Sequence, residues 1–254
     1  MTLTLEKRIG FFLIVVVLTL TCSWAQAEGL QGYYTEEEVR IFHPLGGPDK
    51  IITRKSWYAG DRMRKDEQWE GITIARFDLG RIYLLDTHTR TYVEVSSDFL
   101  QKNSESVLAG FGLPAEDGRG IYFPDDLYIR TETTKEIGRW SCYQVMTNPK
   151  YRTPDSPYVV IWYSTDVDFP VQVFGEQLKQ LFGDSPTVEG LFDRLSKFEG
   201  YPVRTEAHGS NTVTTTTLYK IEYRRDIDPS LFEIPEDYNG VELPEDMTGV
   251  QRTP

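Results

Sequence analysis

Short runs of β-branched and aromatic residues, separated by turn residues, follow one another along most of the chain. Between residues 71 and 95 apolar and polar residues alternate, which is the period of strands that bury one face. Connections of three to five residues are typical of antiparallel hairpins. The pattern predicts about nine to eleven antiparallel strands. The expected strands span residues 34–42, 50–58, 62–67, 71–77, 81–86, 91–95, 127–136, 140–147, 158–165, 201–208 and 212–224.

The register of three neighbouring strands decides which side chains share a face. If residues 78–80 form the first loop, Ile74 lies opposite Leu84, and if residues 87–90 form the next, Leu84 lies opposite Val93. This register predicts one apolar face, made of Ile72, Ile74, Ile82, Leu84, Val93 and Val95. A sheet with such a face covers it with helices, a second sheet or a ligand.

Helical segments interrupt the strands at three places. The first is capped by Ser97 or Asp98 and extends to residue 108, the second spans residues 171–182, and the third spans residues 186–198. No segment has the composition of a linker. We therefore predict one mainly β domain (α+β) over residues 28–240, followed by an acidic flexible tail over residues 241–254.

The first 27 residues have the pattern of a secretory signal. Lys7 and Arg8 precede an apolar stretch at residues 9–20, and an A-x-A motif ends at Ala27. The stretch is shorter than the roughly 20 residues of a membrane-spanning helix, so cleavage after Ala27 is favoured over a retained anchor. Lipid attachment at Cys22 is a minor alternative, because the residues before it are not small.

Charge and cysteine content narrow the partners and the chemistry. The formal charge is −12 and becomes −13 without residues 1–27. We expect no nucleic-acid partner, and contact with a membrane at most peripheral, because such a chain has no basic field for phosphates. Cys142 is then the sole cysteine, so no internal disulfide forms, and we interpret its thiol as a small buried hydrophobe.

Catalytic and metal-binding motifs are missing from the sequence. Hydrolase, zinc-protease, nucleotide-binding and thioredoxin patterns are absent, and no acidic cluster has the spacing of a calcium loop. We therefore predict no enzyme activity, no catalytic residues, no metal and no cofactor. An enzyme without a recognised motif is a third hypothesis, for which Asp166 and Asp168 are the best candidates. Their simpler interpretation is as turn and helix-start residues.

Six phrases occur in order over most of residues 30–238. They are WYAGDRMRKDE (57–67), IARFDLGRIYLLDTHTRTYVEV (74–95), TTKEIGRWSCYQV (133–145), VIWYSTDVDFP (160–170), GYPVRTE (200–206) and DIDPSLFEIPEDY (226–238). This series resembles the bacterial exported family DUF4412, which is similar to the LolA/LolB-like lipoprotein-carrier superfamily. The resemblance implies an open, curved antiparallel half-barrel around a few short helices, with an apolar cavity for acyl chains. It also implies a periplasmic carrier or sensor in a Gram-negative bacterium, and no catalytic residues.

Two functions follow as the main hypotheses. The first is a periplasmic binding protein that holds a lipid-like or lipoprotein ligand in an apolar cavity without catalysis. Its expected ligand-lining residues are Trp57, Ile72, Ile74, Ile82, Leu84, Val93, Val95 and Trp162. The alternative is an envelope structural or protein-interaction module with a dry core, whose partner is another envelope protein.

Overall fold

A computed structural model describes residues 29–44, 46–68, 71–103, 124–152, 158–183, 186–209 and 212–242. The expected signal at residues 1–27 lies outside these ranges, as do residues 243–254 of the expected tail. The strands are β1 (Leu30–Phe42), β2 (Lys50–Ala59), β3 (Arg62–Glu67), β4 (Gly71–Arg76), β5 (Arg81–Asp86), β6 (Thr91–Ser96), β7 (Tyr128–Ile137), β8 (Trp140–Thr147), β9 (Tyr158–Ser164), β10 (Tyr201–His208), β11 (Val213–Ile227) and β12 (Asn239–Val241).

These strands form one twelve-stranded sheet in the order β12-β6-β5-β4-β3-β2-β1-β11-β10-β9-β8-β7. Consecutive hairpins build both halves of the sheet, and the long pairing of β1 with β11 joins them in the middle. No described strand joins β12 to β7, so over the described ranges the sheet is an open half-barrel. The prediction of a mainly β fold with an open antiparallel sheet and few helices is confirmed.

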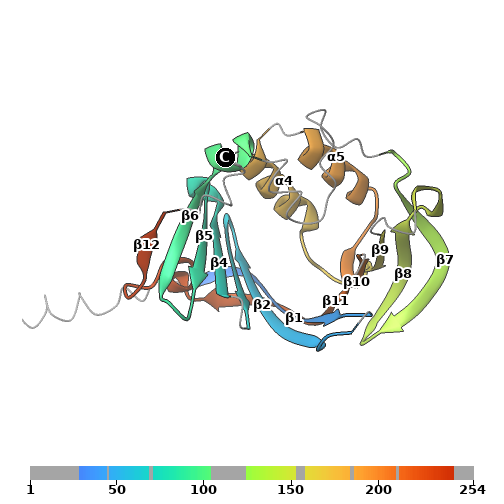
Figure 1. Ribbon diagram of the computed structural model, residues 1–254, viewed down its shortest axis with the longest axis horizontal. Helices are drawn as coiled ribbons and strands as arrows, with labels where there is room; N and C mark the ends of the chain where they lie inside the picture. The colour runs from blue at the N-terminus through green and yellow to red at the C-terminus, as the bar shows by residue number, and fades with distance from the viewer. Residues whose placement is uncertain are drawn as a thin grey trace, which may run out of the picture.

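The helices lie on the concave side of the curved sheet (Figure 1). They are α2 (Ser97–Lys102), α4 (Val171–Phe182) and α5 (Pro186–Leu195), and single 3-10 turns occur at η1 (Phe77–Leu79), η2 (Pro149–Tyr151) and η3 (Pro229–Phe232). We call the sheet face toward α2, α4 and α5 the concave face and the other the convex face. Among the described residues, none of the helices has the length and apolar character needed to cross a membrane.

The hairpin between β4 and β5 corrects the predicted register. Arg76 lies opposite Arg81, and Ile74 lies opposite Tyr83 rather than Leu84. The loop is one residue longer than expected because Phe77 leaves the strand, starts η1 and packs its ring beside α2 and α4. A slip of one residue moves every side chain of a strand to the other face. Ile72 and Ile74 therefore point to the convex face.

Several element boundaries also differ from the sequence prediction. The cap of α2 is Ser96, whose Oγ accepts a hydrogen bond from the Phe99 amide at 3.2 Å. The helix ends at Lys102, and residues 104–108 of the expected helix lie outside the described ranges. Helix α5 ends at Leu195 rather than at residue 198. Val241, assigned to the tail, instead ends β12, which pairs with β6 in parallel.

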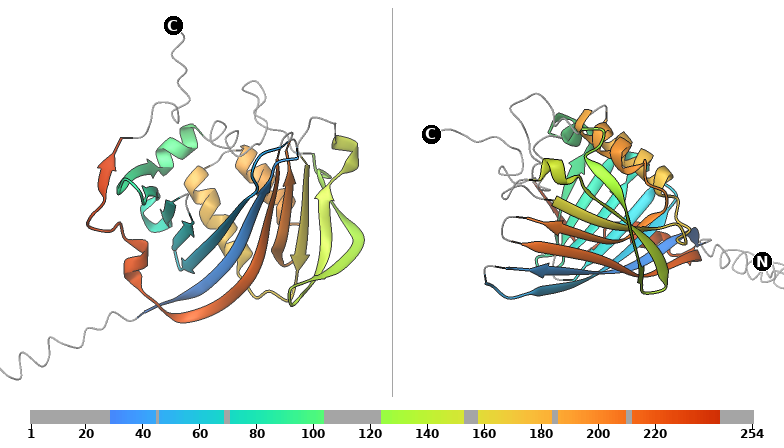
Figure 2. Two further views of the ribbon diagram at one scale, coloured as in Figure 1. Left: turned by 60° about the horizontal axis from the view of Figure 1, so that its bottom comes forward. Right: turned by 90° about the vertical axis from the view of Figure 1, so that its right-hand side faces the viewer.

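The C-terminal segment covers the convex face of the β3–β6 half. Phe232 in η3 is 1% exposed and packs with Ile74, Tyr83 and Leu85. The Arg64 guanidinium donates a hydrogen bond to the Leu231 carbonyl oxygen at 3.0 Å. Figure 2 shows η3 and β12, coloured red, on the outer side of the half-barrel. We call residues 228–241 the C-terminal strap.

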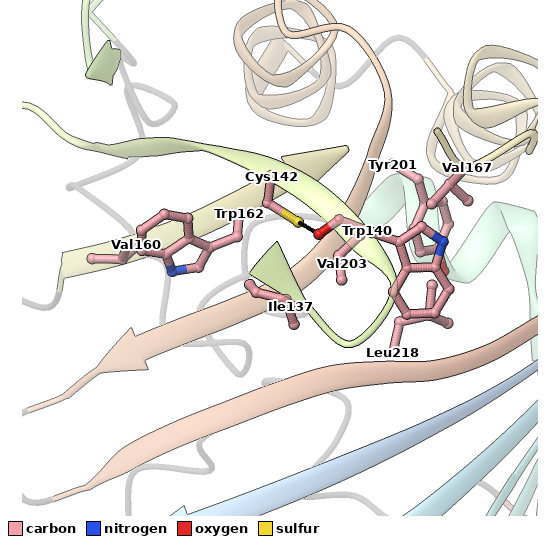
Figure 3. Packing of buried hydrophobic residues seen from close by; sticks show 9 residues of the cluster. All are labelled: Ile137, Trp140, Cys142, Val160, Trp162, Val167, Tyr201, Val203 and Leu218. Atoms are coloured by element: carbon pink, nitrogen blue, oxygen red, sulfur yellow. Dashed lines mark hydrogen bonds between the residues drawn. The ribbon is translucent and has the colours of Figure 1, made fainter. Parts of the chain in front are cut away.

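Cys142 lies in a cluster on the other half of the sheet. Its side chain is 2% exposed, which confirms the expectation of a buried thiol. The thiol donates a hydrogen bond to the Trp140 carbonyl oxygen over a distance of 3.5 Å (Figure 3). Burial raises the pKa of the Cys142 thiol, so the neutral form is favoured and the residue is a packing element.

Candidate functional site

The concave face of the β5–β6 half is apolar and packs against helices. Strands β5 and β6 alternate in the expected way, with Ile82 opposite Val95 and Leu84 opposite Val93. These side chains form a cluster with Leu100 of α2 and Leu181 of α4. Leu181 is 1% exposed, so α4 is anchored on this half of the sheet through one fully buried residue.

The concave face of the β8–β9 half is apolar as well, and it combines two tyrosines with Val145 and Ile161. Tyr143 and Tyr163 stack with their ring centroids 5.8 Å apart, next to Leu195 and Phe198 at the end of α5. The Tyr143 hydroxyl donates a hydrogen bond to the Glu199 carbonyl oxygen at 2.6 Å. Burial raises the pKa of Tyr163, which keeps its hydroxyl neutral. The helical layer therefore contacts both halves of the sheet through apolar groups.

A charged row crosses the concave face between the two apolar regions. Arg54 on β2 lies opposite Glu37 on β1 and Glu67 on β3. Its guanidinium contacts Glu37 Oε2 at 3.2 Å and Glu67 Oε1 at 2.6 Å, and Lys65 Nζ contacts Glu67 Oε2 at 3.2 Å. Both glutamates are about 15% exposed or less in their side chains. We call these four residues the polar row.

The charges of the polar row outweigh the cost of burial. Burial alone would raise the pKa of Glu67, but the positive charges of Lys65 and Arg54 hold it below its ordinary value of 4.5. Burial lowers the pKa of Arg54, and the two carboxylates overcome that effect and raise it. Both shifts favour the charged forms of Glu67 and Arg54, and the two groups are paired with each other. This keeps a hydrophilic strip between the two apolar regions of the concave face.

An aromatic group surrounds Phe169, in the connection from β9 to α4. Its ring centroid lies 5.1 Å from each of the rings of Tyr33, Tyr58 and Tyr201. Burial raises the pKa of Tyr58 to about 12, and burial together with nearby negative charge raises that of Tyr201. These hydroxyls therefore stay neutral, and Phe169 joins β1, β2 and β10 through aromatic packing.

The structure divides the sequence-predicted lining between the two faces. Ile82, Leu84, Val93 and Val95 lie together on the concave face, as expected from their pairing. The other four lie elsewhere. Ile72, Ile74 and Trp57 pack against the C-terminal strap, and Trp162 lies between Ile161 and Tyr163, so it points away from α5.

The sequence prediction missed the polar row and the tyrosines of the β8–β9 half. Glu37, Arg54 and Glu67 occur in strands and have opposite charges, which is a signal for cross-strand pairs. Their side chains meet only in the register that the whole sheet imposes. Trp162 is covered by Lys135, whose Nζ lies 3.7 Å from the ring centroid. The strand that contains Trp162 is fully apolar, which predicted that both of its faces are buried. That pattern did not predict that a lysine side chain covers the tryptophan.

No protein-family model and no curated protein matches the chain. Among solved structures, PNGF-II aligns with a TM-score of 0.38 and 11% identity, covering 84% of this chain and 32% of that one, so this chain spans about a third of PNGF-II. A LolA superfamily protein from Nitrosomonas europaea aligns with a TM-score of 0.33 and 9% identity, covering 80% and 90% of the two chains. An outer membrane lipoprotein-sorting protein domain from Vibrio parahaemolyticus aligns with a TM-score of 0.33 and 7% identity, covering 85% and 94%. At TM-scores this low the similarities carry no conclusion about function, and the resemblance to DUF4412 stays a prediction.

Proposed function

We propose that this protein is exported to the periplasm and there holds a lipid-like molecule or a lipoprotein acyl chain between the concave face and its helices. The observation that carries the proposal is the placement of α2, α4 and α5 across the open side of the half-barrel, on apolar contacts at both halves of the sheet. Small-molecule sites are concave and lined mainly by apolar side chains, which is the character of this face.

The way in which the helices are held supports this role. Hydrophobic packing has no preferred direction, so an acyl chain replaces helix contacts at little cost in free energy. Leu181 and Leu100 cover the β5–β6 half, whereas Leu195 and Phe198 cover the β8–β9 half. Displacing these side chains exposes an apolar wall on each half, and an entering chain covers it again.

The polar row limits the kind of ligand. A plain hydrocarbon lying across the concave face would pass over Arg54, Glu37 and Glu67, and it would offer these charges no hydrogen bonds. An amphiphile places its polar group there and its chain on one of the apolar halves. We therefore propose a ligand with both a polar group and an acyl chain, bound without chemical conversion.

Export to the periplasm is part of the proposed function, and the mass of the mature chain tests it. The full chain is produced in a Gram-negative host, recovered from the periplasm without detergent and measured by native mass spectrometry. We expect a mature chain that begins at Glu28 and carries a bound lipid, which a fluorescent fatty acid displaces. Protein that is consistently empty and also fails to bind the fluorescent fatty acid contradicts the binding role. A stoichiometric envelope partner captured by such empty protein would favour the interaction module.

Two neighbouring substitutions locate the ligand on the sheet. Leu84 points to the concave face, whereas Leu85, the next residue of β5, points to the convex face and is 3% exposed. Leu84→Gln and Leu85→Gln both remove apolar packing and lower the free energy of unfolding. We expect only Leu84→Gln to weaken binding of the fluorescent fatty acid, measured well below the unfolding transition. Equal loss in both variants would place the ligand elsewhere.

A further inference from the structure

A pocket of about 340 Å³ lies where four distant parts of the chain meet. The β7–β8 turn, the connection from β9 to α4, the start of β1 and the middle of β11 each contribute to it. Its lining residues are Tyr33, Arg139, Trp140, Asp166, Val167, Asp168, Ile221, Glu222 and Tyr223. The volume falls at the lower end of the range of pockets that hold small ligands, which starts at roughly 300 Å³.

Aromatic rings form part of the pocket wall. Tyr33 and Tyr223 are in edge contact, with centroids 5.3 Å apart, and Tyr223 is 52% exposed. Trp140 is buried beside Val167 (Figure 3), and the Arg139 guanidinium lies over its ring at 5.1 Å from the centroid. This contact within the chain shows that the wall already accepts an organic cation. Such cation–π contacts are strongest where water is partly excluded.

The charges in the lining are not balanced. Glu222 is paired with Lys220 and Arg224, outside the lining. Asp166 Oδ2 accepts a hydrogen bond from the Ser141 amide at 3.3 Å. In the described part of the chain, no cationic side chain lies within ion-pair distance of Asp166 or Asp168. Both carboxylates therefore lack an ion pair among the described residues, and they lie beside aromatic rings in a lining that has Arg139 as its one cationic side chain.

The field of Asp168 reaches the aromatic wall. Burial raises the pKa of Tyr33, and the negative charge of Asp168 raises it further. Tyr33 also touches Phe169, so the pocket adjoins the aromatic group at the end of the concave face. A positive ligand in the pocket would meet the Asp168 carboxylate on one side and the tyrosine rings on another.

We propose that this pocket binds an organic ammonium group, with Asp168 and Asp166 as its countercharges and Tyr33 and Tyr223 as its aromatic contacts. Aromatic rings contribute no oxygen ligands of the kind that hard divalent cations require. A neutral sugar would leave both carboxylates without a countercharge. The pocket lies at the end of the concave face, and its lining shares no residue with the apolar clusters of the β5–β6 and β8–β9 halves, so choline binding and fatty-acid binding are tested separately.

The first experiment titrates the full chain with choline by calorimetry, alongside 3,3-dimethylbutan-1-ol, a neutral compound of the same shape. We expect saturable binding of choline and none of the alcohol. Asp168→Asn should weaken choline binding about five-fold, the effect of one charge pair near 4 Å in water. The matched control is Asp49→Asn, an exposed aspartate next to the far end of β1. Absence of saturable binding, equal binding of the alcohol, or equal loss in Asp49→Asn would overturn the proposal.

A second variant tests the competing cation. Arg139 occupies the face of Trp140 and adds positive charge to the lining, so Arg139→Ala should tighten choline binding about two-fold or more. Weaker binding in this variant would mean that Arg139 itself holds the ligand, which overturns the assignment of a cation. Thermal unfolding of each variant shows whether its fold is kept, and Asp166→Asn replaces Asp168→Asn if the latter unfolds.

Two further probes identify the source of the ammonium group. Phosphocholine represents a lipid headgroup, and Nα-acetyl-lysine methylamide represents a basic side chain of a peptide. If one of them binds with an affinity at least five-fold higher, it identifies the source of the ammonium group. Comparable affinities for both support a site that recognises the ammonium group alone. Failure of both, where choline also fails, contradicts the proposal without touching the fatty-acid measurements on Leu84→Gln.

Discussion

At the scale of single residues, the polar row is the feature with the largest electrostatic consequence. Arg54 is 25% exposed in its side chain and serves two carboxylates at once. Removing one partner of a buried ion pair leaves the other charge without compensation, which costs more than the pair itself contributes. The row is therefore sensitive to the loss of its shared cation.

We expect Arg54→Leu to lower the free energy of unfolding by about 3 kcal/mol, because Glu37 and Glu67 lose the cation that they share and only Glu67 keeps a second partner, Lys65. Urea unfolding measures the change. The control is Arg40→Leu, which removes the same type of pair, with Glu38, at a guanidinium that is 60% exposed. Its effect should be far smaller, because surface pairs contribute little. Similar effects in both variants would mean that the row is as well solvated as the surface.

Glu67 gives the row a dependence on pH. Its folded pKa lies below its ordinary value of 4.5, so its contribution to stability is present above that value and is lost as pH falls through the folded pKa. We expect the wild-type protein to be more stable than Glu67→Gln at about pH 7, and the difference to shrink toward about pH 3. Urea unfolding across this range checks it. A difference that grows in acid contradicts the pairing of Glu67 with Arg54 and Lys65.

At the scale of elements, alternation was sufficient to predict eleven strands but not the pairing of all of them. The β5–β6 register followed from the pattern, since its turn is short and polar. The β4–β5 register did not, because the position of Phe77 is decided by burial beside α2 and α4, and by the bidentate contact of Arg76 with Asp78 at 2.7 and 2.8 Å. Sequence alternation carries no information about such tertiary contacts.

The other differences between the predicted and the observed elements also depend on tertiary contacts that the sequence pattern does not contain. Strand β12 has only three residues and pairs in parallel, so no hairpin signal precedes it. The predicted pairing of β5 with β6 is confirmed, whereas Ile72 and Ile74, whose predicted face depended on the Phe77 turn, point to the opposite face. The pocket around Asp168 joins residues from β1 and β11 that are far apart in sequence. Only the β1–β11 pairing brings them together.

The pairing of β12 with β6 predicts how the protein responds to truncation of its C-terminus. A chain that ends at Tyr238 leaves the outer edge of β6 without a partner, whereas a chain that ends at Glu242 keeps β12. Unpaired edges associate with other chains. We expect concentration-dependent association only for the shorter chain, measured by light scattering after size-exclusion chromatography. If the two truncated chains behave alike, β12 does not protect this edge.

At the scale of the whole molecule, two coverings protect opposite faces of one curved sheet. Helices cover the concave face, and the C-terminal strap covers the convex face of the β3–β6 half. Leu181 anchors α4 and Phe232 anchors the C-terminal strap, and each residue is 1% exposed. Only the helical covering is expected to give way to a ligand.

Leu181→Ala and Phe232→Ala should each lower the free energy of unfolding by about 3 kcal/mol through the cavity they create. Loosening α4 should also raise the fluorescence of the apolar dye 8-anilinonaphthalene-1-sulfonate added to folded protein, because the concave face becomes accessible. Loosening the strap should not. An equal rise in Phe232→Ala would show that both faces admit apolar molecules and that the concave face is not special.

The position of β1 in the middle of the sheet sets an order of events during synthesis. One partner of β1 is β2, which follows it directly in the chain. The other partner, β11, is made much later, because Gln31 and Tyr223, which share a hydrogen bond, are 192 residues apart. Until β11 has been made, one side of this thirteen-residue strand has no native partner. Glu36, Glu37 and Glu38 lie in its middle, and like charges on one nascent chain repel the same strand of another. We therefore expect the acidic run to limit association between chains during the interval before β11 is made and pairs with β1.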